Sequence, residues 1–233
     1  MMDFFEAISK RRSVRRFREE VVPTEVVQKA IDAALLAPNS SNLQPWEFYW
    51  VRSAVSKEKL VKACFDQPAA GTAAELVVAV SRLDTWRKHR RLVVDDIAKK
   101  GSVPKSVATY YGKLVPLSYV QDPFGILAIL KWMVFNLVGR FRPAPRRPVS
   151  RADLFEVVTK TTALGCENLM LAVAAQGYGS CPMEGFDEAR VAKILGLNRH
   201  CHVVMVIGIG VPDPAGIFGE SYRVPRELVV HEI

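Results

Sequence analysis

One polar turn in the chain, residues 37–48, has the composition of a surface that holds a flat polar ligand. It lies between a helix-like and a strand-like segment and combines small hydroxyls with amides and two prolines. Asn39, Ser40 and Asn42 offer several hydrogen-bond donors and acceptors on short side chains, so a planar molecule could approach closely. A polar loop that binds nothing would have the same composition, and the turn alone does not separate these two interpretations.

A basic cluster lies upstream of this turn. Six of the nine residues 10–18 are Lys or Arg, and none is acidic. The planar guanidinium of Arg can bind two oxygens of an anion at once. Together with the hydroxyl of Ser13, the cluster therefore predicts a cradle for a phosphate or another anion. A solvated basic surface and a nucleic-acid-binding patch are the alternatives.

Two later segments add to this pattern. Within residues 182–186, Gly185 would let the backbone pass close to a planar ring, because glycine has no side chain. Arg223 follows a loop rich in proline and glycine and could supply a further cation. Alone, the first segment would be a plain loop between helices, and the second an exposed arginine in a tail.

In this order and spacing, the four segments resemble the nitroreductase family of flavoenzymes. The motifs are an Arg-Arg-Ser-x-Arg cluster, a Ser-Asn-x-Gln-Pro-Trp turn, a Pro-x-Glu-Gly-Phe loop and a late Arg-x-Pro. The resemblance covers residues 2–83 and 150–230. It implies an α+β, nitroreductase-like fold, in which helices flank a central, mostly antiparallel sheet and two chains form an intertwined homodimer. A single such domain would span residues 1–233, with a variable helical insertion at about 84–149.

The resemblance also implies which residues bind FMN at the dimer interface. By direct match these are Arg11, Arg12, Ser13, Arg15, Asn39, Ser40, Asn42, Gln67, Pro182, Met183, Glu184, Gly185 and Arg223. The arginine cluster would face the phosphate, ribityl chain and pyrimidine edge, whereas the turn at Asn39 would come from the partner subunit. A backbone N–H at Glu184 would lie near flavin N5. Gln67 is the weaker match, and Ser221 stands where some members have lysine, so the arginines would carry more of the phosphate binding.

The implied function is an FMN-dependent oxidoreductase that uses NAD(P)H. It would reduce nitroaromatic or quinone-type acceptors by ping-pong hydride transfer through flavin N5. The cation of Arg15 near the N1–O2 edge would raise the flavin reduction potential, and no catalytic side chain or metal is expected because the flavin carries the chemistry. The same fold with another flavin reaction is an alternative: reductive dehalogenation, flavin fragmentation or dehydrogenation. A basic protein that binds nucleic acid or a membrane is the remaining one.

The composition fits a globular protein with one substantial core. The chain has 233 residues, of which 49% are apolar and 24% charged, and its net charge is +8. The four cysteines are widely spaced with no CxxC and there are only four histidines, so no metal set is visible. The first residues do not resemble a signal peptide, which predicts a cytoplasmic protein. Basic segments at 87–91 and 140–151 could steer NAD(P)H, contact an acidic membrane or simply be solvated.

Helices and strands are expected from the hydrophobic periodicity and from capping residues. The expected helices cover residues 3–10 (capped by Asp3, with Phe4, Phe5 and Ile8 buried), 24–37 (capped by Thr24, with Leu35 in its apolar stripe), 56–63 (capped by Ser56), 153–176 and 187–196. The expected strands cover residues 47–51, 75–80 and 202–210, with an edge strand at 227–230. Gly165 within the long helix predicts a close crossing with another helix.

The central segment 84–149 is the least typical part of the chain. It contains an apolar run of 15 residues, 124–138, interrupted by Lys131 and Asn136. As a helix, this run would be about 22 Å long, too short to cross a hydrocarbon core of roughly 30 Å. It is expected to cap the active site or to extend the dimer interface, and Phe124, Trp132 and Phe135 are the candidate substrate-pocket residues. Plain core packing and a membrane-surface contact through 124–142 are the alternatives.

Overall fold

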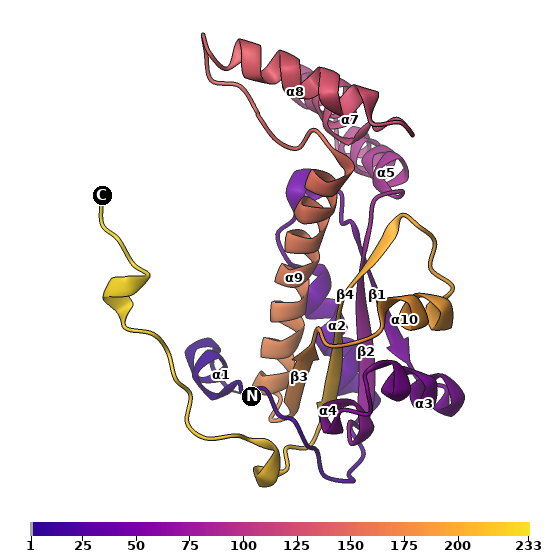
Figure 1. The fold of residues 1–233 in the computed structure, drawn as a ribbon, viewed down its shortest axis with the longest axis vertical. Coiled ribbons are helices and arrows are strands. Elements are labelled where there is room, and N and C mark those ends of the chain that lie inside the picture. Colours follow the sequence, from indigo (N-terminus) through magenta and orange to yellow (C-terminus); the bar gives the residue numbers. More distant parts are fainter. Residues whose placement is uncertain (1) are drawn as a thin grey trace.

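The structure is a computed structural model and describes residues 2–233. Its helices and strands follow one another along a chain that builds one sheet and its flanking helices (Figure 1). The elements are α1 (Phe4–Lys10), α2 (Thr24–Leu35), η1 (Ser40–Asn42), β1 (Trp46–Val51), α3 (Ala54–Ala63), α4 (Pro68–Gly71), β2 (Glu75–Arg82), α5 (Trp86–Lys99), α6 (Lys105–Thr109), η2 (Tyr110–Leu114, a π-helical turn), α7 (Val115–Tyr119), α8 (Ile126–Val138), α9 (Arg151–Ala175), β3 (Gly179–Met183), α10 (Glu188–Leu195), β4 (Cys201–Gly210), η3 (Pro214–Gly216) and η4 (Arg226–Leu228).

The four strands form one antiparallel sheet in the order β1-β2-β4-β3. The central strands β2 and β4 are almost continuously apolar and buried, because helices cover both faces of the sheet. The strand β3 is missing from the sequence-based prediction, which treated residues 182–186 as a loop. Its Gly179 and Pro182 weaken the strand signal, yet an edge strand tolerates proline because one side of its backbone needs no partner. The predicted α+β fold with a mostly antiparallel sheet is confirmed.

The helices form a layer on each face of the sheet. On one face α2 and α9 pack with β2 and β4 around Val27, Ala30 and Leu169, all fully buried. On the other face α3, α4 and α10 cover the sheet. A Cβ at Gly165 of α9 would lie 3.0 Å from the Phe48 ring and 3.2 Å from the carbonyl oxygen of Ala34 in α2. The close crossing predicted at Gly165 is therefore confirmed.

Several local predictions need correction. The N-cap of α2 is Pro23 rather than Thr24, and Ser53 rather than Ser56 caps α3. Residues 227–230 form no strand but overlap the short turn η4, since no strand edge lies beside them. The helix α1 does start after Asp3. However, its three apolar side chains are not buried in this protomer, and neither is the end of the α2 stripe: Phe4, Phe5, Ile8 and Leu35 are 63%, 79%, 46% and 47% exposed.

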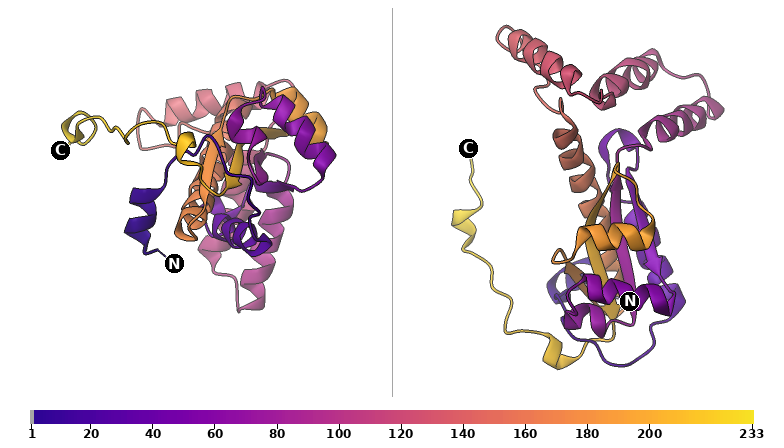
Figure 2. Two further views of the ribbon diagram at one scale, coloured as in Figure 1. Left: turned by 90° about the horizontal axis from the view of Figure 1, so that it is seen from below. Right: turned by 45° about the vertical axis from the view of Figure 1, so that its right-hand side comes forward.

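The chain between β2 and α9 leaves the sheet as a helical excursion made of α5 to α8. The right-hand view of Figure 2 shows this excursion projecting beyond one end of α9, whereas the C-terminal segment leaves the opposite end of the molecule and runs back along its side, apart from the helices. Within residues 2–233, no helix has the length and apolar character needed to cross a membrane.

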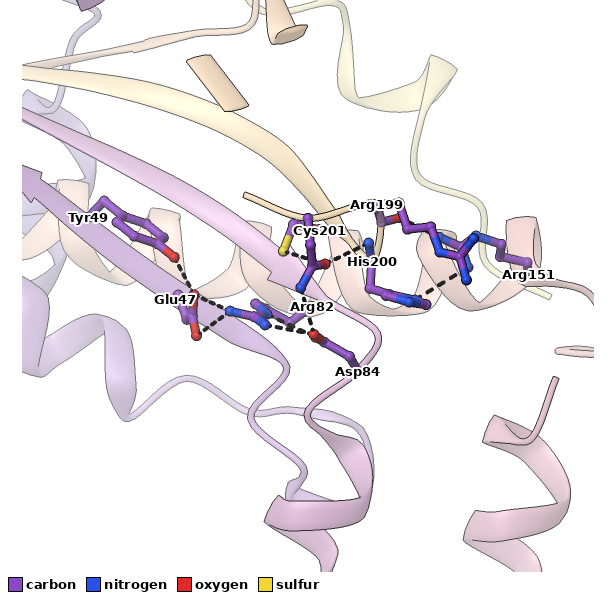
Figure 3. A network of polar contacts seen from close by, with 9 residues as sticks. Glu47, Tyr49, Arg82, Asp84, Arg151, Arg199, His200 and Cys201 are labelled. Atoms are coloured by element: carbon purple, nitrogen blue, oxygen red, sulfur yellow. Dashed lines mark hydrogen bonds and ion pairs between the residues drawn. The ribbon is translucent and has the colours of Figure 1, made fainter. Parts of the chain in front are cut away.

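A polar network fastens the sheet at the end from which the excursion departs (Figure 3). The guanidinium of Arg82, at the end of β2, donates to both carboxylate oxygens of Glu47 at 2.8 and 2.9 Å and to both of Asp84 at 2.9 and 2.7 Å. Asp84 also accepts from Asn198, in the loop before β4, at 3.1 Å. These bonds raise the pKa of the Arg82 side chain and lower that of Asp84 to about 2. The network therefore ties β1 to the end of β2 through Arg82, and the end of β2 to the loop before β4 through Asp84.

Candidate functional site

The basic cluster of residues 10–18 divides into paired and unpaired side chains. Arg16 pairs with Asp213 at 3.4 Å, and Arg18 pairs with Glu20 at 3.7 Å. Within residues 2–233, Arg11, Arg12 and Arg15 form no ion pair with a carboxylate. These three are the arginines that the motif selected, so the structure leaves their charge available for an external anion.

Backbone contacts with β3 and with the segment after β4 position this cluster. The Val14 N–H donates to the carbonyl of Ser180 at 3.0 Å, and the Arg15 N–H donates to that of Gly216 at 2.8 Å. The Arg12 side chain donates to the carbonyl of Gly219 at 2.9 Å, and the Arg15 guanidinium lies 5.1 Å from the Phe218 ring centroid. The cluster is thus held against the edge strand β3 and the segment after β4.

A small cavity of about 150 Å³ lies beside the cluster and is lined by Arg11, Arg12 and Ser180, among others. The hydroxyl of Ser180 is buried and has no hydrogen-bond partner within the described residues. A buried hydroxyl without a partner is uncommon, and it leaves a donor and an acceptor beside two guanidinium groups that have no carboxylate partner within residues 2–233. The cavity is smaller than the roughly 300–1,000 Å³ of a typical ligand pocket, so it is too small to enclose a cofactor-sized ligand by itself.

The loop that follows β3 is in contact with Gln67, another of the predicted FMN-binding residues. The Gln67 amide donates to the carbonyl of Gly185 at 2.6 Å, which brings these two predicted residues together. The side chain of Met183 is buried at 4% exposure, so only its backbone can reach a ligand. The N–H groups of Glu184 and Gly185 donate no hydrogen bond within residues 2–233. Two backbone donors are therefore free where a flavin N5 acceptor was expected.

Cys181 lies in β3 next to this loop, but its thiol is not reactive. Its side chain is buried, and burial raises the pKa of the thiol, while the nearby charge of Arg15 only partly opposes that shift. A neutral buried thiol is a weak nucleophile, so its contribution is to packing.

The predicted turn around Asn39 lies at the opposite end of the sheet. Across the sheet, Trp46 at the start of β1 pairs with Ser81, which pairs with His202 of β4. Gly179 at the start of β3, next to the arginine cluster, pairs with Gly210 of β4. Eight residues of β4 separate these two levels, which corresponds to roughly 25 Å. Asn39, Ser40 and Asn42 therefore do not meet the arginine cluster within one protomer.

Hydrogen bonds within the turn and to the excursion hold its conformation. Asn39 accepts the Gln44 N–H at 2.9 Å, and Ser41 shares a hydrogen bond of 2.7 Å with the hydroxyl of Tyr110. Ser41, Asn42 and Gln44 have positive φ angles of 57°, 48° and 46°, a conformation that non-glycine residues adopt only when the surroundings hold them. Tyr110 was not among the predicted residues, because nothing in the sequence near residue 110 indicates a contact with residue 41.

Arg223 and the predicted aromatic residues stand apart from the cluster. Arg223 lies on the projecting C-terminal segment, and within residues 2–233 it donates hydrogen bonds only to Ser221 and Tyr222. Phe124 and Trp132 of the excursion are 85% and 56% exposed, and Phe135 is half-buried. The structure of one protomer thus gathers the cluster, Gln67 and the loop after β3 along one edge of the sheet. The other predicted residues do not lie beside this edge in the same chain, and they could join it only from a second copy of the chain.

Comparisons with known proteins agree with this architecture. The nitroreductase family model matches residues 8–211. A protein named NADH dehydrogenase from Thermus thermophilus is 30% identical over 237 residues, covering 99% of this chain and 96% of the relative. The Bacillus subtilis protein ydfN, described as a nitroreductase, has the same fold with a TM-score of 0.76 at 22% identity, over 99% of this chain and 98% of that one.

A second solved structure, from Exiguobacterium sibiricum, is described as a nitroreductase in complex with FMN. It superposes with a TM-score of 0.73 at 23% identity, over all of this chain and 98% of the other. The family model spans most of the chain, and the first relative matches nearly its full length. The family predicted from the motifs is therefore confirmed, and the chain belongs to the nitroreductase family.

Proposed function

We propose that this chain is an FMN-dependent oxidoreductase that takes electrons from NAD(P)H and passes them to nitroaromatic or quinone-type acceptors in ping-pong order. Membership of the nitroreductase family supports the enzyme class, the cofactor and the electron donor. The observation in the structure that carries the proposal is the edge of β3. In the part of the chain that the structure describes, three arginines without carboxylate partners lie there, together with a loop whose N–H groups at Glu184 and Gly185 have no acceptor.

The residues along this edge suit the separate parts of FMN. Arg11 and Arg12 would neutralise the phosphate, which carries nearly two negative charges, and Ser13 would donate from its hydroxyl. Arg15 would lie at the pyrimidine edge, where its cation favours the reduced flavin. The free N–H groups of Glu184 and Gly185 would hold the ring in place. When bound, FMN supplies the electron transfer between donor and acceptor.

A second copy of the chain would complete this site. The cavity of about 150 Å³ beside the cluster is too small for a flavin, and the turn bearing Asn39, Ser40 and Asn42 lies at the other end of the sheet. Apolar side chains of α1 and of the C-terminal segment are exposed, including Phe5 at 79% and Leu228 at 65%. Burying them against a partner would stabilise a homodimer and bring the partner's turn to this edge. The four free cysteines suit the reducing cytoplasm as its location.

The test is the absorption spectrum of the purified protein before and after anaerobic addition of NADH or NADPH. We expect flavin bands that bleach with at least one nucleotide and return when a quinone or a nitroaromatic compound is added. A colourless protein that takes up no added FMN would contradict the proposal. A flavoprotein that reacts with oxygen after reduction but ignores both acceptor classes would favour the alternative reactions, among them reductive dehalogenation.

A further inference from the structure

The helix α8 exposes apolar side chains over much of its surface. Each of the following is between 46% and 64% exposed: Ile126, Ile129, Leu130, Trp132, Met133, Val134 and Leu137. The helix lies at the extremity of the excursion, away from the sheet (Figures 1 and 2). A surface helix normally turns its apolar stripe toward the core and its polar residues toward water. In α8 the apolar side chains face outward instead.

The two polar residues of α8 are turned inward or bonded locally. Lys131 is only 8% exposed, and its ammonium donates to the carbonyl of Val120 at 2.6 Å. The Asn136 amide donates to the carbonyl of Trp132 at 2.8 Å and accepts from Arg146 at 2.9 Å. Because these polar groups already have partners, the outer surface of the helix can leave water without losing a hydrogen bond.

A run of positive charge accompanies this apolar surface. Residues 123–152 contain six Lys or Arg and no Asp or Glu. Arg140 and Arg142, which directly follow α8, are exposed and form no ion pair within residues 2–233. Exposed apolar side chains on a helix and unpaired arginines next to it both favour contact with the headgroup region of an anionic bilayer.

The surface around α8 differs in charge from the other exposed apolar segments. The helix α1 carries both Glu6 and Lys10, and the C-terminal segment carries Glu227 beside Arg226. Such mixed charge suits contact with a second copy of the chain. The segment 123–152 is purely basic, and a second copy brings the same net charge of +8. An anionic lipid surface therefore complements it better than another protomer does.

We propose that α8 and residues 139–147 dock on the surface of an anionic membrane. The helix has 13 residues and a length of about 20 Å, so it would lie in the plane of the interface rather than cross the bilayer. The apolar side chains enter the boundary between headgroups and acyl chains, and Arg140 and Arg142 meet the lipid phosphates. This inference concerns where the protein works and does not depend on the reaction proposed above.

Trp132 provides a direct test. It is 56% exposed, whereas Trp46 and Trp86 are each 6% exposed, so its indole is well placed to report on contact with lipid. We expect vesicles of equal parts phosphatidylcholine and phosphatidylglycerol to shift the protein fluorescence to the blue and to co-sediment with the protein. Pure phosphatidylcholine should do so far less, and added salt should reverse the binding. The Trp132→Phe variant should bind but lose the spectral shift.

Two pairs of variants separate the apolar and the electrostatic contributions. The double variant Ile129→Glu and Met133→Glu should lose vesicle binding, while Val55→Glu, at an equally exposed apolar position of α3 (61%), should bind as wild type does. Arg140→Gln with Arg142→Gln should weaken binding by roughly 30-fold, whereas Lys59→Gln should have little effect. Thermal midpoints equal to that of wild type would show that each variant folds.

Two results would overturn the proposal. Equal binding of the wild type and of the Ile129→Glu, Met133→Glu variant would show that α8 does not contact lipid. A Trp132 emission that is already that of a buried indole, and that vesicles leave unchanged, would show that a second copy covers the helix. In the latter case, the same double variant should also lower the dimer mass measured by sedimentation.

Discussion

The arginines at the two ends of the sheet have opposite surroundings. Arg82, at one end of the sheet, has both sides of its guanidinium occupied by the carboxylates of Glu47 and Asp84. Arg11 and Arg15, at the other end, form no ion pair within the described part of the chain, although Arg16 and Arg18, which follow them, do. The first group has its charge neutralised inside the protein, and the second does not.

We expect the first kind of arginine to contribute to the stability of the folded protein and the second to the binding of an anion. An arginine bonded to two carboxylates contributes to the folded state, because its charge is neutralised and most of its five N–H donors are already used. Clustered arginines without such partners repel one another in the free protein, and an anion that binds them relieves this repulsion. Substitutions in the two groups should therefore have opposite signatures, one in unfolding and the other in ligand affinity.

The largest effect is expected from the double variant Arg11→Gln and Arg15→Gln. Each charge-assisted hydrogen bond is worth about 1.5–3 kcal/mol, so FMN should bind roughly 1,000-fold more weakly. The thermal midpoint of the flavin-free protein should stay the same or rise. Fluorescence titration with FMN measures the affinity.

The matched control lies in the same cluster. Arg16→Gln with Arg18→Gln removes the same charge, but from arginines that are already paired with Asp213 and Glu20. We expect this variant to keep FMN affinity within about fivefold of wild type, since only long-range charge is lost. Equal losses in the two double variants would show that net charge rather than the individual contacts binds the cofactor.

The next largest effect is expected from Arg82→Met. It would leave Glu47 and Asp84 without their cation at positions where their side chains are 37% and 28% exposed. We expect a loss of about 3 kcal/mol in the free energy of unfolding, measured by urea denaturation, with little change in FMN affinity for the folded fraction. Arg52→Met, which removes an exposed arginine stacked on Trp50, should cost less than about 1 kcal/mol.

A smaller effect is expected from Gln67→Ala. This substitution removes the 2.6 Å bond that holds the carbonyl of Gly185, so the loop after β3 gains freedom. A single neutral hydrogen bond contributes about 1 kcal/mol, which corresponds to a roughly fivefold loss of FMN affinity. Gln28→Ala, on the exposed side of α2, serves as the control and should change nothing. An unchanged affinity in Gln67→Ala would mean that the loop keeps its conformation without this bond.

The smallest effect concerns acid stability. The Arg82 guanidinium lowers the pKa of Asp84 to about 2, below its ordinary value of 3.8. A carboxylate with a depressed folded pKa contributes stability above its unfolded pKa and loses it as the pH falls. We expect about 1 kcal/mol, after allowance for solvent screening, to be lost between about pH 4 and pH 2. In Asp84→Asn, urea midpoints measured across this range should lose that part of the slope.

The helices and central strands were predictable because their signals are local. The N-caps Asp3 and Asp187 and the apolar runs of β2 and β4 define elements within a few residues. The edge strand β3 was missed because Pro182 and Gly179 are poor strand formers, and only the pairing with β4 makes them extended. The periodicity predicted that Phe4 and Phe5 are buried, but no element within residues 2–233 covers them.

The candidate site was predictable in its residue types but not in its assembly. The motif singled out Arg11, Arg12 and Arg15, but their lack of carboxylate partners depends on where Asp213 and Glu20 lie in three dimensions. The unpartnered hydroxyl of Ser180 and the stacking of Arg15 on Phe218 arise from contacts across the fold, for which the sequence gives no local signal.

The strand order β1-β2-β4-β3 has a consequence for synthesis on the ribosome. Strand β2, whose residues 76–81 are all buried, must wait for β4, which pairs Leu76 with Gly208. At roughly 5–20 residues per second, the nascent chain exposes one edge of β2 for on the order of ten seconds before its neighbour is made. During that interval an apolar strand with an open edge can pair with other nascent chains. Slower initiation of translation, or a chaperone that covers the open edge of β2, should therefore raise the yield of folded protein.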